Sequence, residues 1–197
     1  MAIITIKQGT EDGYLIKTGS TYPPTTLGIG GNTSVLAYGA ENWYPAPTYC
    51  ITRSYLRFDT SVIPSGVVIA RAKLWLRLYN KDNADGFNVQ LQLYRDTGDW
   101  GTLDTGDWGC GDTQIATKNY ADLPAIGSWF SIDIPVNQIN KGGITAFEIR
   151  GDHESGTAPT GINSVSLYSA DNSGSEPYLE IEYLLPGTGA MLLMFLG

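Results

Sequence analysis

Apolar and polar residues alternate with a period of two along most of the chain. Leu74, Leu76 and Leu78, for example, are separated by Trp75 and Arg77. Successive side chains of an extended strand point to opposite faces, so this alternation predicts strands with one buried face and one solvated face. The inward positions are expected to form one shared core. They are Leu56, Phe58, Leu74, Leu76, Leu78, Val89, Leu91, Leu93, Ile132, Ile134, Phe147, Ile149, Leu179 and Ile181.

The number and spacing of these segments predict an all-β fold. About ten candidate strands follow one another, as in a sandwich or jelly roll. The 24 glycines and 10 prolines supply the turns between them. Strands with one dry face are typical of antiparallel sheets that pack against each other. We therefore expect one antiparallel, jelly-roll-like β-sandwich domain over residues 1–185, long enough to bury a sizeable core.

Long loops separate some of the predicted strands. Loops on a rigid sandwich are the usual location of binding residues, so we expect function to lie in them. The longest loops are residues 18–33, 39–48, 97–112 and 151–163.

The last twelve residues, 186–197, differ in character from the rest of the chain. Residues 186–189 predict a hinge, and the seven residues 190–196 are uniformly apolar. A membrane-spanning helix needs roughly 20 residues, so we expect no membrane insertion. An apolar segment left free in water promotes aggregation, and we expect it to be buried on its own domain or in another subunit. We favour assembly of a homo-oligomer through Met191, Leu192, Leu193, Met194, Phe195 and Leu196.

The chain is acidic, with a net charge of −8 and a pI near 4.5. Nucleic acids and anionic lipids bind to basic surfaces, so neither is an expected partner. Residues 1–7 enter the alternating pattern without a basic start or a long apolar run. No signal peptide is therefore predicted, and synthesis in a cytosol is expected.

Catalysis is not expected from this sequence. The one histidine, His153, lies in a polar loop, where a surface role is far more common than a place in a catalytic triad. None of the 20 acidic residues is singled out as part of a glycosidase pair. Cys50 and Cys110 are too few for a disulfide framework or a four-cysteine metal site. Free thiols are favoured over a single disulfide, because disulfides are uncommon in proteins made in a cytosol.

Two acidic clusters raise the possibility of calcium. Asp82, Asn83 and Asp85 place oxygen ligands close together beside Gly86. The same residue types form turns, and the distal glutamate of an EF-hand is missing, so a turn is favoured and no cofactor is expected. The second cluster consists of Asp99, Asp104, Asp107 and Asp112.

Aromatic residues are the best candidates for binding. Trp43, Tyr44 and Tyr49 lie in a loop that two prolines stiffen. Such rings cap a core, anchor a protein interface or stack on sugar faces, and all three alternatives stay open for this loop. Trp75 alternates out of phase with three leucines, so it is expected on an outer face, covered by a loop or a neighbour.

The chain resembles the DNRLRE (disaggregatase-related) family. A predicted strand over residues 54–59, a turn at 63–66 and a second strand over 69–74 are similar to the hairpin that marks this family. Five further pieces follow the family's order. They are residues 9–16, 30–39, 94–96 together with Trp100 and Trp108, 135–143 and 177–183. The resemblance implies a β-sandwich module of the kind used for adhesion, carbohydrate binding or virion structure, in which Trp100 and Trp108 cap a loop.

This resemblance leads to two functional hypotheses, both without catalysis. The first is a virion structural protein, either a capsid decoration protein or a tail or fibre component, whose partners are other virion proteins and itself. The alternative is a carbohydrate-binding adhesion module that recognises a surface polysaccharide, such as a host glycan. The predicted lack of an export signal favours location in a virion over an extracellular or cell-surface location.

Overall fold

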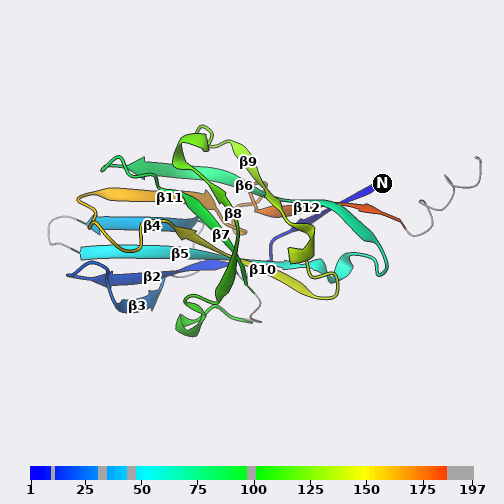
Figure 1. The fold of residues 1–197 in the computed structure, drawn as a ribbon, viewed down its shortest axis with the longest axis horizontal. Coiled ribbons are helices and arrows are strands. Elements are labelled where there is room, and N and C mark those ends of the chain that lie inside the picture. Colours follow the sequence, from blue (N-terminus) through cyan, green and yellow to red (C-terminus); the bar gives the residue numbers. More distant parts are fainter. Residues whose placement is uncertain (10–11, 31–34, 44–47, 97–100, 186–197) are drawn as a thin grey trace, which may run out of the picture.

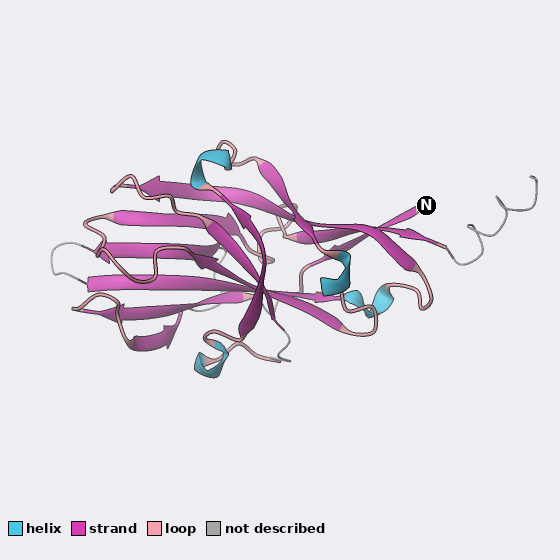
Figure 2. Ribbon diagram, viewed as in Figure 1, coloured by secondary structure: helices cyan, strands magenta, loops and turns pink. Residues whose placement is uncertain are grey.

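Antiparallel strands make up almost all of the regular structure (Figure 1, Figure 2). The structure is a computed structural model that describes residues 1–9, 12–30, 35–43, 48–96 and 101–185. It confirms the predicted all-β sandwich and contains twelve strands. They are β1 (Ala2–Lys7), β2 (Gly13–Gly19), β3 (Thr26–Ile29), β4 (Val35–Trp43), β5 (Thr48–Asp59), β6 (Val68–Asn83), β7 (Leu91–Asp96), β8 (Gly111–Lys118), β9 (Trp129–Ile134), β10 (Ile144–Gly151), β11 (Ile162–Tyr168) and β12 (Tyr178–Leu184).

Helical structure in the described part of the chain is limited to short 3-10 turns of three residues each. In this part, no helix is long and apolar enough to cross a membrane. The turns are η1 (Thr60–Val62), η2 (Thr105–Asp107), η3 (Tyr120–Asp122) and η4 (Val136–Gln138).

The long strand β6 joins one layer, formed with β1, β12 and β9, to the other layer, which contains β11, β4, β5, β10, β7 and β8. Both β6 and the long strand β5 change partner along their length. One edge of β6 pairs with β12 up to Trp75 and with β11 from Leu78 onward, while its other edge pairs with β9. In the same way, β5 pairs with β4 up to Thr52 and with β10 from Ser54 onward. The resulting strand order is β1-β12-β6-β11-β4-β5-β10-β7-β8, with β9 paired to β6 and the hairpin of β2 and β3 paired to β5 as branches.

Glycines permit the close approach of strands where β5 changes partner. Gly39 has a φ of +137°, and a Cβ at this position would lie 2.3 Å from the carbonyl oxygen of Asn163. A Cβ on Gly151, at the end of β10, would lie 3.2 Å from the Cα of Gly39. Only glycine combines this backbone conformation with this lack of space, so β4, β10 and β11 meet at these two residues.

The core between the two layers contains all fourteen residues predicted from the alternation. Leu56 and Phe58 of β5 pack there with Leu74 and Leu76 of β6, and all four side chains are fully buried. The period-two pattern therefore identified the inward face correctly on both of the long strands.

The outer face of β5 differs from the expectation of a solvated surface. Tyr55 is fully buried and forms a second, smaller cluster with Leu15 and Ala146. Leu103 and Trp108, from the connection between β7 and β8, pack over this cluster. Tyr55 is an outward residue by alternation, but a loop that is distant in sequence covers it.

Some of the predicted functional residues lie outside the described part of the chain. They are Tyr44, Asp99, Trp100, Met191, Leu192, Leu193, Met194, Phe195 and Leu196. Because the tail is among them, the boundary at residue 185 between domain and tail stays a prediction.

Replacement of Leu76 by alanine is expected to lower the free energy of unfolding by about 2–5 kcal/mol, because a fully buried side chain leaves a cavity. Ile126, which is 58% exposed, is the matched control, and Ile126→Ala should change stability by less than about 0.5 kcal/mol. Urea denaturation of both variants gives the comparison. Equal losses would show that Leu76 is not a core residue.

A buried carboxyl group precedes β2. Asp12 is 2% exposed, and its Oδ2 accepts a hydrogen bond of 2.9 Å from the amide of Ala170. Burial, with a smaller contribution from the neighbouring Asp171, raises the pKa of Asp12 to about 6. The folded protein therefore holds this proton more tightly than the unfolded chain, in which aspartate titrates near pH 3.9.

The raised pKa of Asp12 predicts that its contribution to stability is fully present below about pH 4 and is lost as the pH rises to about 6. Asp12→Asn cannot ionise, so this part of the pH dependence should be absent. The loss between pH 4 and pH 7 should be larger in the parent protein by an amount on the order of 1–3 kcal/mol. Identical pH profiles of urea unfolding would contradict the assignment.

Candidate functional site

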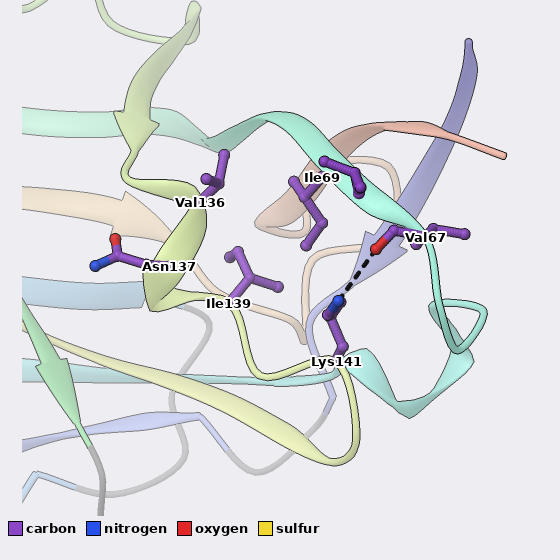
Figure 3. A pocket seen from close by; sticks show the side chains of 7 residues that line it. Val67, Ile69, Val136, Asn137, Ile139 and Lys141 are labelled. Atoms are coloured by element: carbon purple, nitrogen blue, oxygen red, sulfur yellow. Dashed lines mark hydrogen bonds between the residues drawn. The ribbon is translucent and has the colours of Figure 1, made fainter. Parts of the chain in front are cut away.

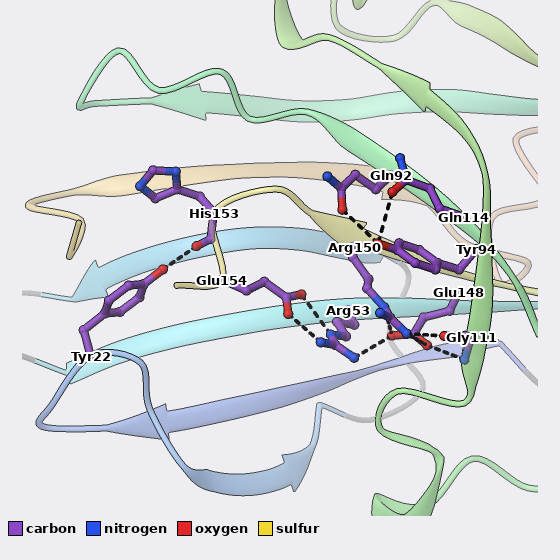
Figure 4. A network of polar contacts seen from close by, with 10 residues as sticks. All are labelled: Tyr22, Arg53, Gln92, Tyr94, Gly111, Gln114, Glu148, Arg150, His153 and Glu154. Carbon is purple, nitrogen blue, oxygen red and sulfur yellow. Dashed lines mark hydrogen bonds and ion pairs between the residues drawn. The ribbon is translucent and has the colours of Figure 1, made fainter. Parts of the chain in front are cut away.

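Strands β5, β10, β7 and β8 share an outer face that carries a row of polar side chains. On β10, the alternation that turns Phe147 into the core turns Glu148 and Arg150 outward. The strand registers place Tyr94 of β7 directly beside Glu148. Figure 4 shows that the row crosses all four strands. We call it the polar row, and it consists of Arg53, Gln92, Tyr94, Gln114, Glu148 and Arg150.

Glu148 is the centre of the polar row and is fully buried. Its Oε1 accepts hydrogen bonds from Nη1 of Arg53 at 2.9 Å and from Nε of Arg150 at 2.7 Å. Its Oε2 accepts from Nη2 of Arg150 at 2.9 Å and from the amide of Gly111 at 2.8 Å. The carboxylate thus fixes two guanidinium groups and the start of β8 (Figure 4).

Arg53 also forms a two-pronged ion pair with Glu154. Its Nε lies 2.8 Å from one carboxylate oxygen of Glu154, and its Nη2 lies 2.5 Å from the other. Burial by itself lowers the pKa of Arg53, but Glu154 and Glu148 outweigh this effect and raise it. Two arginines and two glutamates therefore form one charge-balanced network that orients every member.

Aromatic rings pack against the charged groups of this network. The guanidinium of Arg150 lies 3.9 Å from the ring centroid of Tyr94. Trp108 is contacted by two cations, because Arg53 lies 4.2 Å and the ammonium of Lys17 lies 4.5 Å from its ring. These cation–π contacts hold both rings at the border of the polar row.

The edge of the polar row near β8 is open to solvent. The hydroxyl of Tyr94 lies 3.2 Å from the side-chain oxygen of Gln92 and 3.3 Å from that of Gln114. Gln114 is exposed and Gln92 is half-buried. These amides offer donors and acceptors on the surface, next to groups whose positions are fixed by Glu148.

A second group of rings lies at the loop end of the sandwich, beyond Glu154. Tyr22 and Tyr49 meet edge to face, with ring centroids 5.5 Å apart. The hydroxyl of Tyr22 donates to the carbonyl oxygen of His153, the residue before Glu154 (Figure 4). Trp43 is 48% exposed, and its indole Nε1 donates to the carboxylate of Glu41. We call Trp43, Tyr49 and Tyr22 the end rings.

This arrangement fits a flat ligand that is rich in hydroxyl groups. The amides of Gln92 and Gln114 and the hydroxyl of Tyr94 can donate to and accept from ligand hydroxyls, and the buried network beneath them limits the ordering that binding requires, which lowers its entropic cost. Exposed rings add apolar contacts with the carbon face of such a ligand. Comparison with known families gives the same chemical class: a family model described as carbohydrate-binding module family 96 matches residues 31–183.

This chain belongs to carbohydrate-binding module family 96. The match covers most of the sandwich, including the polar row and the exposed Trp43. It supports the adhesion alternative over the virion hypothesis, and it supports classification as a binding module. No curated protein matches the chain.

The structure describes three of the four predicted binding residues. Tyr49 pairs with Asn42 and Trp43 pairs with Thr48, so both rings lie at the end of the β4–β5 hairpin but on opposite faces of it. Trp75 lies on the other layer, where it stacks on Tyr178 with centroids 5.9 Å apart. As expected, Trp75 is on an outer face and half-buried, and the cover is a ring on the neighbouring strand.

The charged centre of the polar row was not foreseen from the sequence. The alternation with Phe147 and Ile149 turns Glu148 and Arg150 outward and by itself predicts only the solvated side of a strand. A charged residue in the middle of a predicted central strand is a signal, because such a position is seldom open to water. No local pattern could identify Arg53 as the partner of Glu148, because the two residues are 95 positions apart in the sequence.

The residues considered as calcium ligands, for which a turn was favoured, form hydrogen bonds within the chain. Asp85 accepts from the amide of Thr160 at 2.9 Å and from the side chain of Asn163 at 2.6 Å, which ties two loops together. In the second cluster, Asp104 and Asp107 cap the η2 turn reciprocally. Among the described residues, no three acidic, histidine or cysteine side chains gather as a metal site would require.

The cysteines and the histidine have packing roles. Both cysteines are free thiols. Burial raises the pKa of Cys50 to about 11, and the thiol of Cys110 donates to Asp96 at 2.8 Å. His153 stacks on Phe87 with ring centroids 3.9 Å apart. These contacts favour structure over nucleophilic chemistry.

Removal of the Glu148 side chain is expected to be strongly destabilising. Glu148→Ala leaves Arg53, Arg150 and the Gly111 amide without their shared acceptor, which should cost about 3–5 kcal/mol. Glu180 is the matched control, because its carboxylate contacts Arg71 at 3.9 Å on the surface. Glu180→Ala should cost no more than about 1 kcal/mol in urea unfolding. A similar cost for both variants would show that the buried network is not held by Glu148.

Proposed function

We propose that this protein is a non-catalytic module that binds a glycan chain along the polar row. Its membership of a carbohydrate-binding family supports the ligand class. The observation that carries the location is the buried Glu148 carboxylate, which holds two guanidiniums rigidly beside half-exposed rings and amides. The first contacts with sugar hydroxyls are made by Gln114, Gln92 and the hydroxyl of Tyr94. Arg150 holds the ring of Tyr94 in place by packing against it.

The direction of the bound chain follows from the position of the end rings. Glu154 joins the polar row to the loop that contacts Tyr22, so the polar row and the pair Tyr22 and Tyr49 lie on one continuous surface. A glycan of several residues extends from Gln114 past Tyr22 and Tyr49, and a longer one reaches around the hairpin end to stack on the exposed indole of Trp43. In this proposal the strand face supplies hydrogen bonds and the end rings supply stacking.

Location in a virion and assembly with virion proteins stay predictions. The family match gives them no support, whereas it directly favours the adhesion module. The net charge of −8 adds one constraint. An anionic glycan would be repelled by the molecule as a whole, and Arg53 and Arg150 are already paired with Glu148 and Glu154, so a neutral glycan fits this surface better.

The polar row predicts how glycan binding responds to substitution. Affinity electrophoresis in gels that contain neutral and anionic polysaccharides identifies the ligand, and calorimetry measures the affinity. The double substitution Tyr94→Ala with Gln114→Ala should weaken binding at least about tenfold, equivalent to about 1.4 kcal/mol. Tyr79→Ala removes a ring that is 47% exposed on β6, which β11 and β4 separate from β5 in the strand order, and it should leave the affinity unchanged.

Trp43→Ala tests the end rings separately. If the glycan reaches them, affinity for long chains should fall while affinity for short oligosaccharides stays the same. Melting temperatures should stay within a few degrees, because the indole is half-exposed. No loss in either the polar-row variant or the Trp43 variant would disprove this site, and no ligand among the polysaccharides would argue against the function.

A further inference from the structure

The end of the sandwich opposite the end rings carries a concentration of exposed apolar side chains. Strand β1 begins here, β12 ends here, and the turns η1 and η4 lie beside the start of β6 (Figure 1). Monomeric proteins seldom expose contiguous apolar surface without a partner for it. The exposed residues at this end are Met1, Ile3, Val62, Val68, Val136, Leu184 and Leu185.

A cleft of about 410 Å³ opens between η4 and the start of β6 (Figure 3). Ile69 and Ile139 form its buried floor, and the half-exposed Val68 and Val136 form its rims. The ammonium of Lys141 donates to the carbonyl oxygen of Val67 at 3.0 Å, which ties the two walls together at one side. The cleft is therefore a largely apolar groove with fixed walls.

The chain leaves the sandwich beside this cleft. Leu184, the last residue of β12, is the direct partner of Val68, which forms one rim. Residues 186–189 then separate Leu185 from the uniformly apolar segment 190–196, which lies outside the described residues. A linker from Leu185 to Ala190 spans up to about 18 Å when extended, so the cleft is within reach. Pro186 and Gly187 are a pair that favours a turn.

We propose that residues 190–196 bind in this cleft of their own molecule. The segment is apolar throughout and has no polar face of its own, which matches the apolar floor and rims. Attachment through a short linker raises its local concentration to the millimolar range, so binding within the molecule prevails over binding to a second copy. The contact covers both the cleft and the segment and leaves the glycan surface at the other end free. It does not depend on the proposed glycan function.

Methionine methyl NMR of the full chain tests this docking. The protein has three methionines, Met1, Met191 and Met194, so selective methyl labelling reports on the segment directly. The Met191 and Met194 signals should be shifted from their positions in a free peptide and show cross-relaxation with the methyl groups of Val68 and Val136. These features should be the same at all protein concentrations, while light scattering gives the mass of a monomer.

Two matched variants distinguish specific docking in the cleft from non-specific hydrophobic association. Val136→Asp places a charge on the rim of the cleft and should return both signals to their free positions. Ile126→Asp changes an apolar residue that is 58% exposed and does not line the cleft, so it should have no effect. Free-peptide signals in the parent protein, or an equal response to both variants, would overturn the proposal. Signals that shift only at high concentration, together with a dimer mass, would also overturn it and identify a second copy as the occupant.

Discussion

A carboxylate with no exposure to water must be paired, and in this module the pairing of Glu148 organises the candidate site. Its four hydrogen bonds come from β5, from its own strand β10 and from the start of β8. Because an uncompensated buried charge is very costly, these segments cannot move apart without breaking the network. The polar row is rigid because the buried carboxylate of Glu148 must stay paired. The surface offered to a ligand is therefore already ordered before any ligand arrives.

The same strand serves both stability and recognition. The inward residues of β10, Phe147 and Ile149, lie in the main core, whereas its outward residues carry the charges. The alternation of a β-strand separates these two tasks by one residue. Binding groups on a strand are held more precisely than groups on a loop, which suits a module that contacts many weakly interacting hydroxyls.

The two ends of the sandwich have different chemistry. The loop end carries the paired rings of Tyr22 and Tyr49 and, on the other face of the hairpin, Trp43, and all three have polar neighbours. The opposite end is mostly aliphatic and includes Val68 and Val136. A surface of the first kind tolerates water and binds through rings and hydrogen bonds, whereas a surface of the second kind needs cover. This difference between the two ends agrees with a module that binds a glycan near one end and covers the apolar surface at the other.

The sequence by itself determined the fold class and the core. Period-two alternation is local, so the fourteen predicted core residues, from Leu56 to Ile181, were identified without knowledge of their partners. Local pattern also placed Trp75 on an outer face, but it was wrong in assigning Trp43 and Tyr49 to a loop, because Trp43 ends β4 and Tyr49 lies at the start of β5. What lay over an outer face was decided only by the tertiary structure, as the burial of Tyr55 beneath Trp108 shows.

The polar row was likewise decided by tertiary structure alone. Arg53, Glu148 and Glu154 come from segments about a hundred residues apart in sequence, and the strand order brings them into contact. Each residue alone has the character of an ordinary charge on a solvated strand or loop. Alternation determines which face a side chain occupies, because that depends on its own backbone. Its neighbours on that face depend on how distant strands pair, which no local pattern contains.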